Sequence, residues 1–176
     1  DARAPHARMA DIASRGFPPV AGRDARVLIL GSLPGERSIR EHQYYAHPQN
    51  AFWRIMHEVF GIAGEYEDRC GQLIENRVAL WDVLQSSVRP GSMDADIRLA
   101  SALPNAFGPF FDAHSGIDLI AFNGKKAEQL FGRFFYPLGD ADSIQRVGLP
   151  STSPAYASLS FSGKLAAWRD ALLEEQ

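Results

Sequence analysis

The segment Arg26-Val27-Leu28-Ile29-Leu30-Gly31-Ser32 decides the fold class. Its near-continuous apolar run is typical of a β-strand that is buried on both faces, and the glycine marks its end. Strands of this kind belong to parallel sheets that are covered by helices on both sides. Further strands are expected over residues 78–84, 117–122 and 145–149, the last with a weaker pattern.

The segments between these strands favour helices. Residues 50–60 carry apolar side chains at the period of one helix face, and shorter or weaker helices are expected over residues 67–76, 124–135 and from 162 onward. Strands that alternate with helices predict an α/β fold, a three-layer α/β/α sandwich with a short, mostly parallel central sheet of about four strands. We expect residues 1–22, which lack an apolar period, to form an N-terminal arm and residues 23–176 to form a single domain.

Composition excludes several classes of chemistry. The 176 residues include one cysteine, Cys70, which excludes a disulfide framework, a thiolate zinc site and a four-cysteine iron–sulfur cluster. We expect no metal and no cofactor. The net charge of −3 argues against a uniformly basic surface, although two mildly basic segments flank an acidic middle. No apolar stretch is long enough to span a membrane, so we expect a cytoplasmic protein with no membrane partner.

Ligands of parallel sheets bind outside the carboxyl ends of the strands, which here carry the loops 31–50, 82–94, 123–126 and 150–159. In the first loop, Gly31 to Gly35 form a turn whose amides can cradle an anion, or a plain tight turn. The same loop holds the densest aromatic and amide cluster of the chain, Tyr44 to Trp53. Its rings can stack on a base, while the alternative is that Phe52 and Trp53 are core and Asn50 caps the helix.

Four motifs in these loops resemble the uracil-DNA glycosylase superfamily. They read Gly-Ser-Leu-Pro-Gly, Tyr-Tyr-Ala-His-Pro-Gln-Asn-Ala-Phe-Trp, Phe-Asn-Gly-Lys-Lys-Ala and Ser-Thr-Ser-Pro, beginning at residues 31, 44, 122 and 151. The pattern is most similar to the hypoxanthine (deoxyinosine) glycosylase branch and also resembles the mismatch-specific uracil glycosylases. The resemblance implies a monofunctional DNA glycosylase of base excision repair that hydrolyses the N-glycosidic bond of hypoxanthine or uracil after base flipping.

The sequence departs from related branches at two positions. Mismatch-specific members carry an amide where this chain has Leu33, and iron–sulfur members carry a carboxylate where it has Ser32. In the hypoxanthine branch, the duty of holding the water is attributed to the asparagine that corresponds to Asn50, with Asn123 contributing. The resemblance therefore implies Asn50 and Asn123 as catalytic residues.

The remaining site residues are expected to hold the base and the DNA. Hydrogen-bond donors that face the base stabilise the charge that develops on it, and an aromatic ring can stack on the base. The base-binding residues are expected to be Gly31, Ser32, Leu33, Tyr45, His47 and Asn123. Hydroxyls can contact phosphates, and Tyr156 or Leu159 can act as an apolar wedge. The DNA-binding residues are expected to be Pro34, Gly35, Lys125, Ser151, Thr152, Ser153, Tyr156, Ser158 and Leu159.

Three alternatives stay open. The enzyme can prefer uracil to hypoxanthine, or the chain can be a damaged-DNA binding module that kept the pocket and lost the chemistry. A small-molecule hydrolase is disfavoured because the chain has no Gly-x-Ser-x-Gly elbow. The expected partner is DNA that contains a deaminated base, bound by a monomer.

The cysteine count and the lack of metal-ligand spacing among the histidines generate a first prediction. Base excision is expected to persist at full rate in excess EDTA, because the proposed chemistry needs a positioned water and hydrogen-bond donors only. The measurement is a strand-cleavage assay after alkali, with and without chelator. Loss of excision that added metal restores would contradict a metal-free mechanism.

Overall fold

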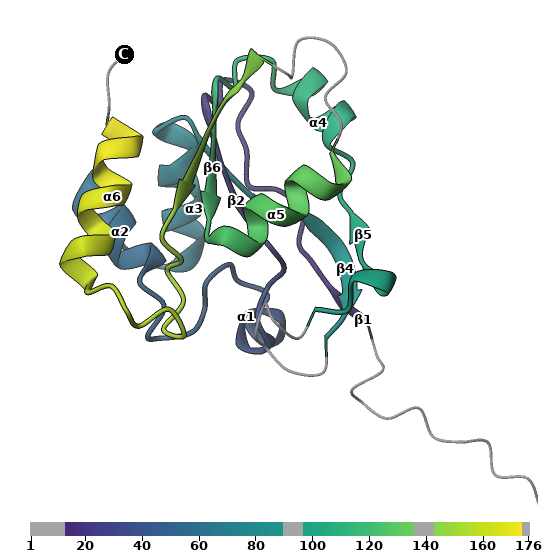
Figure 1. Cartoon of the computed structure of the whole chain (residues 1–176). Helices are drawn as coiled ribbons and strands as arrows, with labels where there is room; N and C mark the ends of the chain where they lie inside the picture. The colour runs from purple at the N-terminus through teal and green to yellow at the C-terminus, as the bar shows by residue number, and fades with distance from the viewer. Residues whose placement is uncertain (1–12, 90–96, 136–142, 174–176) are drawn as a thin grey trace, which may run out of the picture.

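A four-stranded parallel sheet forms the centre of the molecule (Figure 1). The computed structural model describes residues 13–89, 97–135 and 143–173. The sheet has the order β3-β2-β6-β7, and every neighbouring pair is parallel. Its strands are β2 (Val27–Gly31), β3 (Val78–Asp82), β6 (Leu119–Asn123) and β7 (Gln145–Leu149). The four predicted strands are confirmed, except that the strand expected over residues 78–84 ends at Asp82, and Leu84 belongs to another strand.

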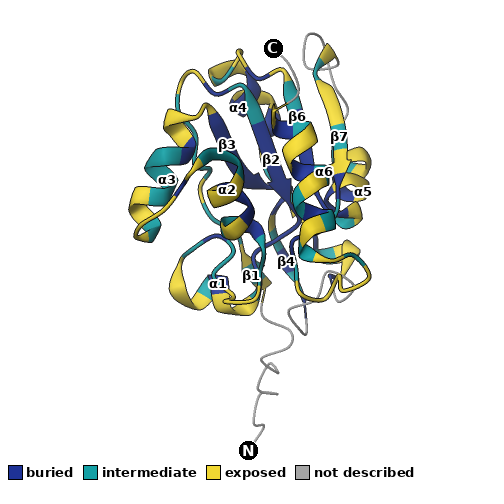
Figure 2. Ribbon diagram, turned by 90° about the vertical axis from the view of Figure 1, so that its left-hand side faces the viewer, coloured by how far each residue is buried: buried dark blue, intermediate teal, exposed yellow. Residues whose placement is uncertain are grey.

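Helices cover both faces of the sheet. On one face lie α2 (Phe52–Phe60), α3 (Tyr66–Glu75) and α6 (Phe161–Leu173), and on the other α4 (Phe107–Ala113) and α5 (Lys125–Phe134). Each face has its own hydrophobic cluster, one centred on Phe52 and Trp168 and the other on Phe107 and Phe131. The predicted three-layer α/β/α sandwich is confirmed, and Figure 2 shows the buried strands behind helices with exposed outer faces.

A second, smaller sheet was not expected from the sequence. It is antiparallel, has the order β1-β4-β5 and consists of β1 (Ala13–Arg15), β4 (Leu84–Val88) and β5 (Leu103–Pro104), with a short 3-10 turn, η3 (Leu99–Ser101), before β5. These strands are short and not apolar runs, so no periodic signal marks them. Because β4 follows β3 after a single residue, it carries the chain directly from the main sheet into the small one.

Residues 13–22 of the expected N-terminal arm contact both sheets. Ala13–Arg15 pairs with β4, and Val20 forms a backbone bridge with Leu80 of the main sheet. Phe17 packs against the Phe52 cluster. These residues are held mainly by backbone pairing, which leaves no period in the sequence. Residues 1–12 of the expected arm lie outside the described residues.

The carboxyl ends of the parallel strands meet at one edge of the sheet. Gly31 is in register with Asp82, and Asn123 with Leu149. The loops 31–50, 123–126 and 150–159 therefore gather at this edge, as predicted, together with the described part of loop 82–94; residues 90–94 lie outside it. No helix within the described ranges is long and apolar enough to cross a membrane.

Candidate active site

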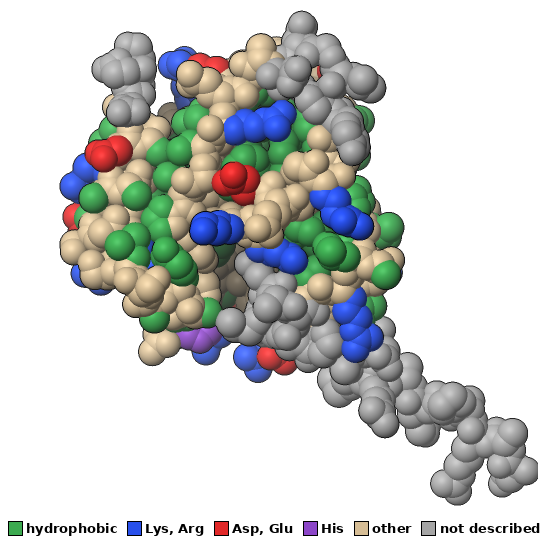
Figure 3. All heavy atoms as spheres, in the orientation of Figure 1, with side chains coloured by type: hydrophobic (Ala, Val, Ile, Leu, Met, Phe, Trp, Pro, Cys, Tyr) green, Lys and Arg blue, Asp and Glu red, His purple; other side chains and the backbone are tan. Residues whose placement is uncertain are grey.

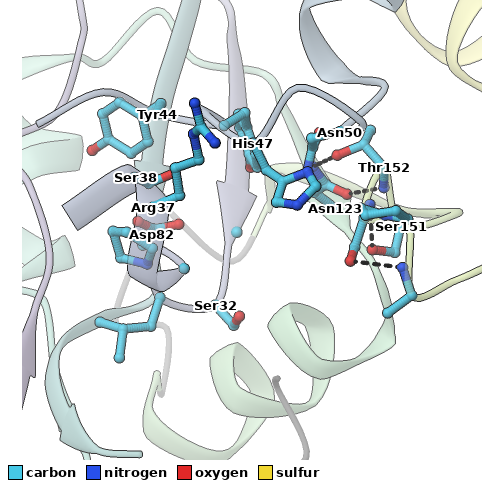
Figure 4. A pocket seen from close by; sticks show the side chains of 18 of the residues that line it. Ser32, Arg37, Ser38, Tyr44, His47, Asn50, Asp82, Asn123, Ser151 and Thr152 are labelled. Carbon is cyan, nitrogen blue, oxygen red and sulfur yellow. Dashed lines mark hydrogen bonds between the residues drawn. The ribbon is translucent and has the colours of Figure 1, made fainter. Parts of the chain in front are cut away.

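A cavity of about 620 Å³ opens at this edge of the sheet (Figure 4). Small-molecule sites usually enclose roughly 300 to 1,000 Å³, so the cavity can hold one small ring system. Its walls come from the segment after β2, the loop before α2, the ends of β3 and β6, and the loop after β7. The lining residues are Gly31–Ser38, Tyr44, Tyr45, His47, Asn50, Asp82, Asn123 and Ser151–Tyr156.

A pair of hydrogen bonds between Asn123 and Thr152 joins two walls of the cavity. Asn123 Oδ1 accepts from Thr152 N and its Nδ2 donates to Thr152 Oγ1, both at 2.9 Å. Both side chains are buried, at 7% and 1% exposure. The carbonyl of Thr152 in turn accepts from Ala51 N at 2.9 Å, which attaches the start of α2. Three loops are thus held in one arrangement, and the Asn123 amide keeps one N–H for other contacts.

Gly124 allows this close approach. Its φ is +94°, a conformation that L side chains rarely adopt. A Cβ at this position would lie 3.1 Å from Ser151 Cβ. The glycine of the Phe-Asn-Gly motif therefore serves the contact between the β6 and β7 loops.

Asn50 lies at the rim of the cavity, one residue before Ala51, the N-cap residue of α2. Its Oδ1 accepts a hydrogen bond from Phe52 N at 3.0 Å, and its own N–H donates to His47 O at 2.9 Å. The bond to Phe52 N supports the alternative that Asn50 helps to start the helix, but it does not use the whole side chain. A carbonyl oxygen has a second lone pair and the amide nitrogen has two protons, so Asn50 can still bind a water in the cavity.

His47 stands at the exposed side of the cavity lining. Its Nδ1 accepts a hydrogen bond from Gln49 N at 3.1 Å. An accepting Nδ1 carries no proton, so a neutral imidazole has its proton on Nε2. The ring therefore offers one N–H donor for a ligand.

Side-chain oxygens of Asp82 and Tyr45 both approach Gly31 closely. A Cβ built on Gly31 would lie 2.5 Å from Asp82 Oδ1 and 2.9 Å from the Tyr45 hydroxyl oxygen. Only glycine leaves room for both oxygen atoms. Asp82 is 3% exposed and lines the cavity, where Figure 4 shows its carboxylate on the side opposite Asn123 and Thr152.

Asp82 was not among the site residues predicted from the sequence. Its signal is a single carboxylate at the end of a buried apolar strand, at the edge where ligands bind. The charge of Asp82 affects the pKa of a neighbouring tyrosine. Burial raises the pKa of Tyr44 far above its ordinary value, and the nearby charge of Asp82 raises this pKa further.

Two of the predicted base-binding side chains belong to the core as well as to the cavity. Leu33 is 6% exposed and joins the Phe107 cluster, so the side chain offers little to a polar ligand. Tyr45 packs its ring on Phe52 at 4.3 Å between centroids and has a φ of +56°. A non-glycine residue in this conformation is strained, and such strain often occurs at binding sites.

Comparisons with known proteins agree with this site. The family model of the uracil DNA glycosylase superfamily matches residues 18–175. The chain belongs to the uracil DNA glycosylase superfamily. The resemblance seen in the four motifs is confirmed, and the protein is a DNA glycosylase, a hydrolase of N-glycosyl bonds whose substrate is DNA.

Curated relatives and a solved structure lie close to this glycosylase. It is 41% identical to a hypoxanthine DNA glycosylase of Methanosarcina barkeri over 64% of this chain and 72% of the relative. It is 37% identical to a hypoxanthine DNA glycosylase of Methanosarcina acetivorans over 80% of this chain and 87% of the relative. A solution structure of a candidate uracil DNA glycosylase from M. acetivorans matches with a TM-score of 0.74 at 34% identity, covering 91% of this chain and 99% of the other.

Some of the predicted DNA-binding residues line the cavity of the glycosylase, and others lie outside it. Pro34, Gly35, Ser151, Thr152, Ser153 and Tyr156 line the cavity. Three others do not: Lys125 is exposed at the start of α5, Ser158 is exposed, and Leu159 packs beside Gly163 of α6, where an added Cβ would lie 2.7 Å from Leu159 Cδ1. Of the two residues expected as an apolar wedge, Tyr156 is the one that lines the cavity, and it is 42% exposed.

The loop that carries Tyr156 is anchored from α6. Lys164 is 5% exposed; its Nζ donates to Ser153 O at 3.2 Å and lies 5.3 Å from the centre of the Tyr156 ring. Trp168 Nε1 donates to Pro150 O at 2.9 Å. Both anchors fix the backbone of the loop and leave the Tyr156 ring at the surface.

The geometry of Asn50 generates a prediction with two readouts, because we propose that this residue holds the attacking water in addition to its capping role. Asn50→Ala is expected to lower the single-turnover excision rate by at least about a hundredfold, on the order of 3 kcal/mol. It is also expected to cost about 1 kcal/mol of stability, because the cap of α2 is lost. Rate and melting curve are measured on the same preparation.

Asn50→Ser is the matched control, since serine keeps an oxygen that can cap the helix. It is expected to recover most of the stability and little of the rate. An alanine variant that is less stable and yet excises at the wild-type rate would show that Asn50 is a cap only.

Proposed function

We propose that this glycosylase is a monofunctional enzyme of base excision repair that removes hypoxanthine, and also uracil, from DNA after flipping the nucleotide into the cavity. The names of the two curated relatives support hypoxanthine as a substrate. The observation that carries the proposal is the buried Asp82 carboxylate in the cavity wall, next to the backbone of Gly31 and Ser32.

This juxtaposition suits the edge that deamination creates. Hypoxanthine and uracil both present a ring N–H beside a carbonyl oxygen, whereas adenine and cytosine present a bare ring nitrogen beside an amino group. A carboxylate accepts hydrogen bonds only, and a backbone N–H donates only. Asp82 can therefore accept from the ring N–H while a backbone N–H of the Gly31–Gly35 turn donates to the carbonyl. Adenine in the same pose would face two mismatched contacts.

The chemistry is a hydrolysis in which the bond between the deoxyribose C1′ and the base nitrogen breaks. Its electron pair leaves with the base, where N–H donors stabilise the developing charge. A water held by Asn50 adds to C1′, the proton that it loses ends on the departed base, and the products are the free base and an abasic site. The cavity lining within the described residues contains no lysine, which supports hydrolysis by water without a Schiff base.

Access to the base requires that the nucleotide leave the stack. Tyr156, exposed at the edge of the cavity, is placed to fill the space that the nucleotide leaves. Figure 3 shows lysine and arginine side chains spread over one face of the molecule rather than gathered in a single patch. This distribution supports binding through few phosphate contacts.

We also propose that a monomer is the active form. A DNA substrate supports the cytoplasmic location expected from the sequence. The uracil-preferring enzyme remains the second candidate, because the matching family model is that of the uracil DNA glycosylase superfamily.

The substrate proposal is tested with oligonucleotides that carry hypoxanthine, uracil, xanthine or adenine in single and double strands. The wild type is expected to excise hypoxanthine and uracil and to leave adenine. Asp82→Asn is expected to lower the rate on hypoxanthine by roughly tenfold or more, since hydrogen bonds to charged groups contribute about 1.5–3 kcal/mol. The variant is also expected to have a smaller ratio of the excision rate on hypoxanthine to the excision rate on adenine.

Asp112→Asn, an exposed acid on α4, serves as the matched control. If Asp82→Asn leaves the ratio of the excision rates on hypoxanthine and adenine unchanged, the carboxylate does not take part in base recognition. Tight binding of hypoxanthine-containing DNA by the wild type without any excision would favour the non-catalytic binding module instead.

A separate prediction concerns Tyr156. If its ring replaces the flipped nucleotide, Tyr156→Ala loses about tenfold or more in rate on paired duplex and much less on single strands, where no stacking has to be broken. Leu159→Ala is the control within the same loop and keeps both rates, because Leu159 packs on α6. Equal losses of Tyr156→Ala on both substrates would exclude the wedge role.

A further inference from the structure

We infer that Arg89 is a positioning residue of the active site, whose buried guanidinium holds the Gly31–Gly35 turn so that backbone N–H groups of this turn face the departing base. The inference rests on the proposed function, because the departing base belongs to the glycosylase reaction. Arg89 follows β4 and is 5% exposed. It lies outside all four motifs that carry the family resemblance.

The carbonyls of four consecutive residues, 31 to 34, accept hydrogen bonds from one neighbouring segment, residues 83–89. Val83 N donates to Gly31 O at 2.8 Å, and Leu84 N donates to Ser32 O at 3.1 Å. The Arg89 guanidinium serves the next two carbonyls: Nη1 donates to Leu33 O at 3.4 Å and Nη2 donates to Pro34 O. The first four carbonyls of the turn are thus held against segment 83–89, while the Gly35 carbonyl accepts from Ile39 N.

Peptide geometry then sets the direction of the N–H groups. In a trans peptide the C=O of one residue and the N–H of the next point in opposite directions. The N–H groups of Ser32, Leu33 and Gly35 therefore point away from segment 83–89, while Pro34 has none. All three residues line the cavity. Successive N–H groups that point the same way form a site for negative charge.

An arginine is suited to this position for two physical reasons. Its planar fork can reach two neighbouring carbonyls at once, whereas the ammonium of a lysine is a point charge on a flexible stem. Hydrogen bonds from a charged donor are also about twice as strong as neutral ones, so the guanidinium resists rotation of the two peptides. Because Ser32 and Leu33 supply no carboxylate or amide side chain, the backbone of the turn is the part that must be held in place.

The first test compares Arg89→Met and Arg89→Lys in single-turnover excision at saturating DNA. Each enzyme is assayed on a base that the wild type excises and on an analogue with a more acidic leaving nitrogen: hypoxanthine with 8-azahypoxanthine, or uracil with 5-fluorouracil. Arg89→Met is expected to lose roughly tenfold or more on the natural base, because misplaced oxyanion-type donors cost rate. The loss is smaller on the acidic analogue, which needs less stabilisation, and DNA affinity is unchanged.

Arg89→Lys is expected to recover part of the rate, since it keeps the charge and can reach one carbonyl. Arg26→Met is the matched control: Arg26 lies just before β2, at the opposite end of the strand, and forms an exposed ion pair with Asp118. A loss that is equal on both leaving groups, or that disappears when rates are corrected for the unfolded fraction, would overturn the inference.

The second test does not depend on catalysis. The amide resonances of Ser32, Leu33 and Gly35 are recorded in the free protein by NMR, together with their hydrogen-exchange rates. Arg89→Met is expected to shift these resonances and to speed their exchange, while amides of α6 stay unchanged. Unchanged turn amides in a folded Arg89→Met variant would overturn the inference. A wild type that excises neither base would instead refute the proposed function, and the amide data would still decide the role of Arg89.

Discussion

The amide of Asn123 holds Thr152 through two hydrogen bonds, and the rest of the pocket is built on this contact. The carbonyl of Thr152 accepts a hydrogen bond from Ala51 N, directly before α2, and Asn50 is the neighbour of Ala51 in the chain. Both partners are buried, so no water competes for their polar groups, and breaking either bond would leave a buried group unsatisfied. The loops after β6 and β7 and the loop before α2, which are far apart in the sequence, are therefore held together as one side of the cavity.

The opposite wall is formed differently. There the Gly31–Gly35 turn lies against residues 83–89, with its carbonyls bound by two backbone N–H groups and by Arg89. Asp82 and Tyr45 bring oxygen atoms to the space above Gly31. In the proposed mechanism, backbone donors and one buried carboxylate take the place of the polar side chains expected in related branches at positions 32 and 33. Backbone donors suit catalysis because they need no reorganisation when charge develops.

Much of the fold and part of the site could be predicted from local patterns. The buried strands and the amphipathic helix over residues 50–60 follow from side-chain periodicity, since burial on one or both faces repeats with the geometry of the element. The small sheet could not be predicted, because β1, β4 and β5 are held by backbone pairing that any side chain permits. Asp82 and Arg89 were missed for a related reason: a charged residue at the end of a strand looks the same in sequence whether it faces solvent or is buried.

The sequence by itself determined the layers, the strand ends at which the site lies, and the family to which the four motifs point. These features depend on residue type and spacing along the chain. Only the tertiary structure decided which polar groups are used up within the protein and which face the cavity: Asn50 binds Phe52 N at the start of a helix, Asn123 is tied to Thr152, Leu33 is core, and Asp82 is in the wall. The physical reason is that hydrogen-bond partners and burial are set by residues distant in sequence, which meet only when the parallel strands align their carboxyl ends.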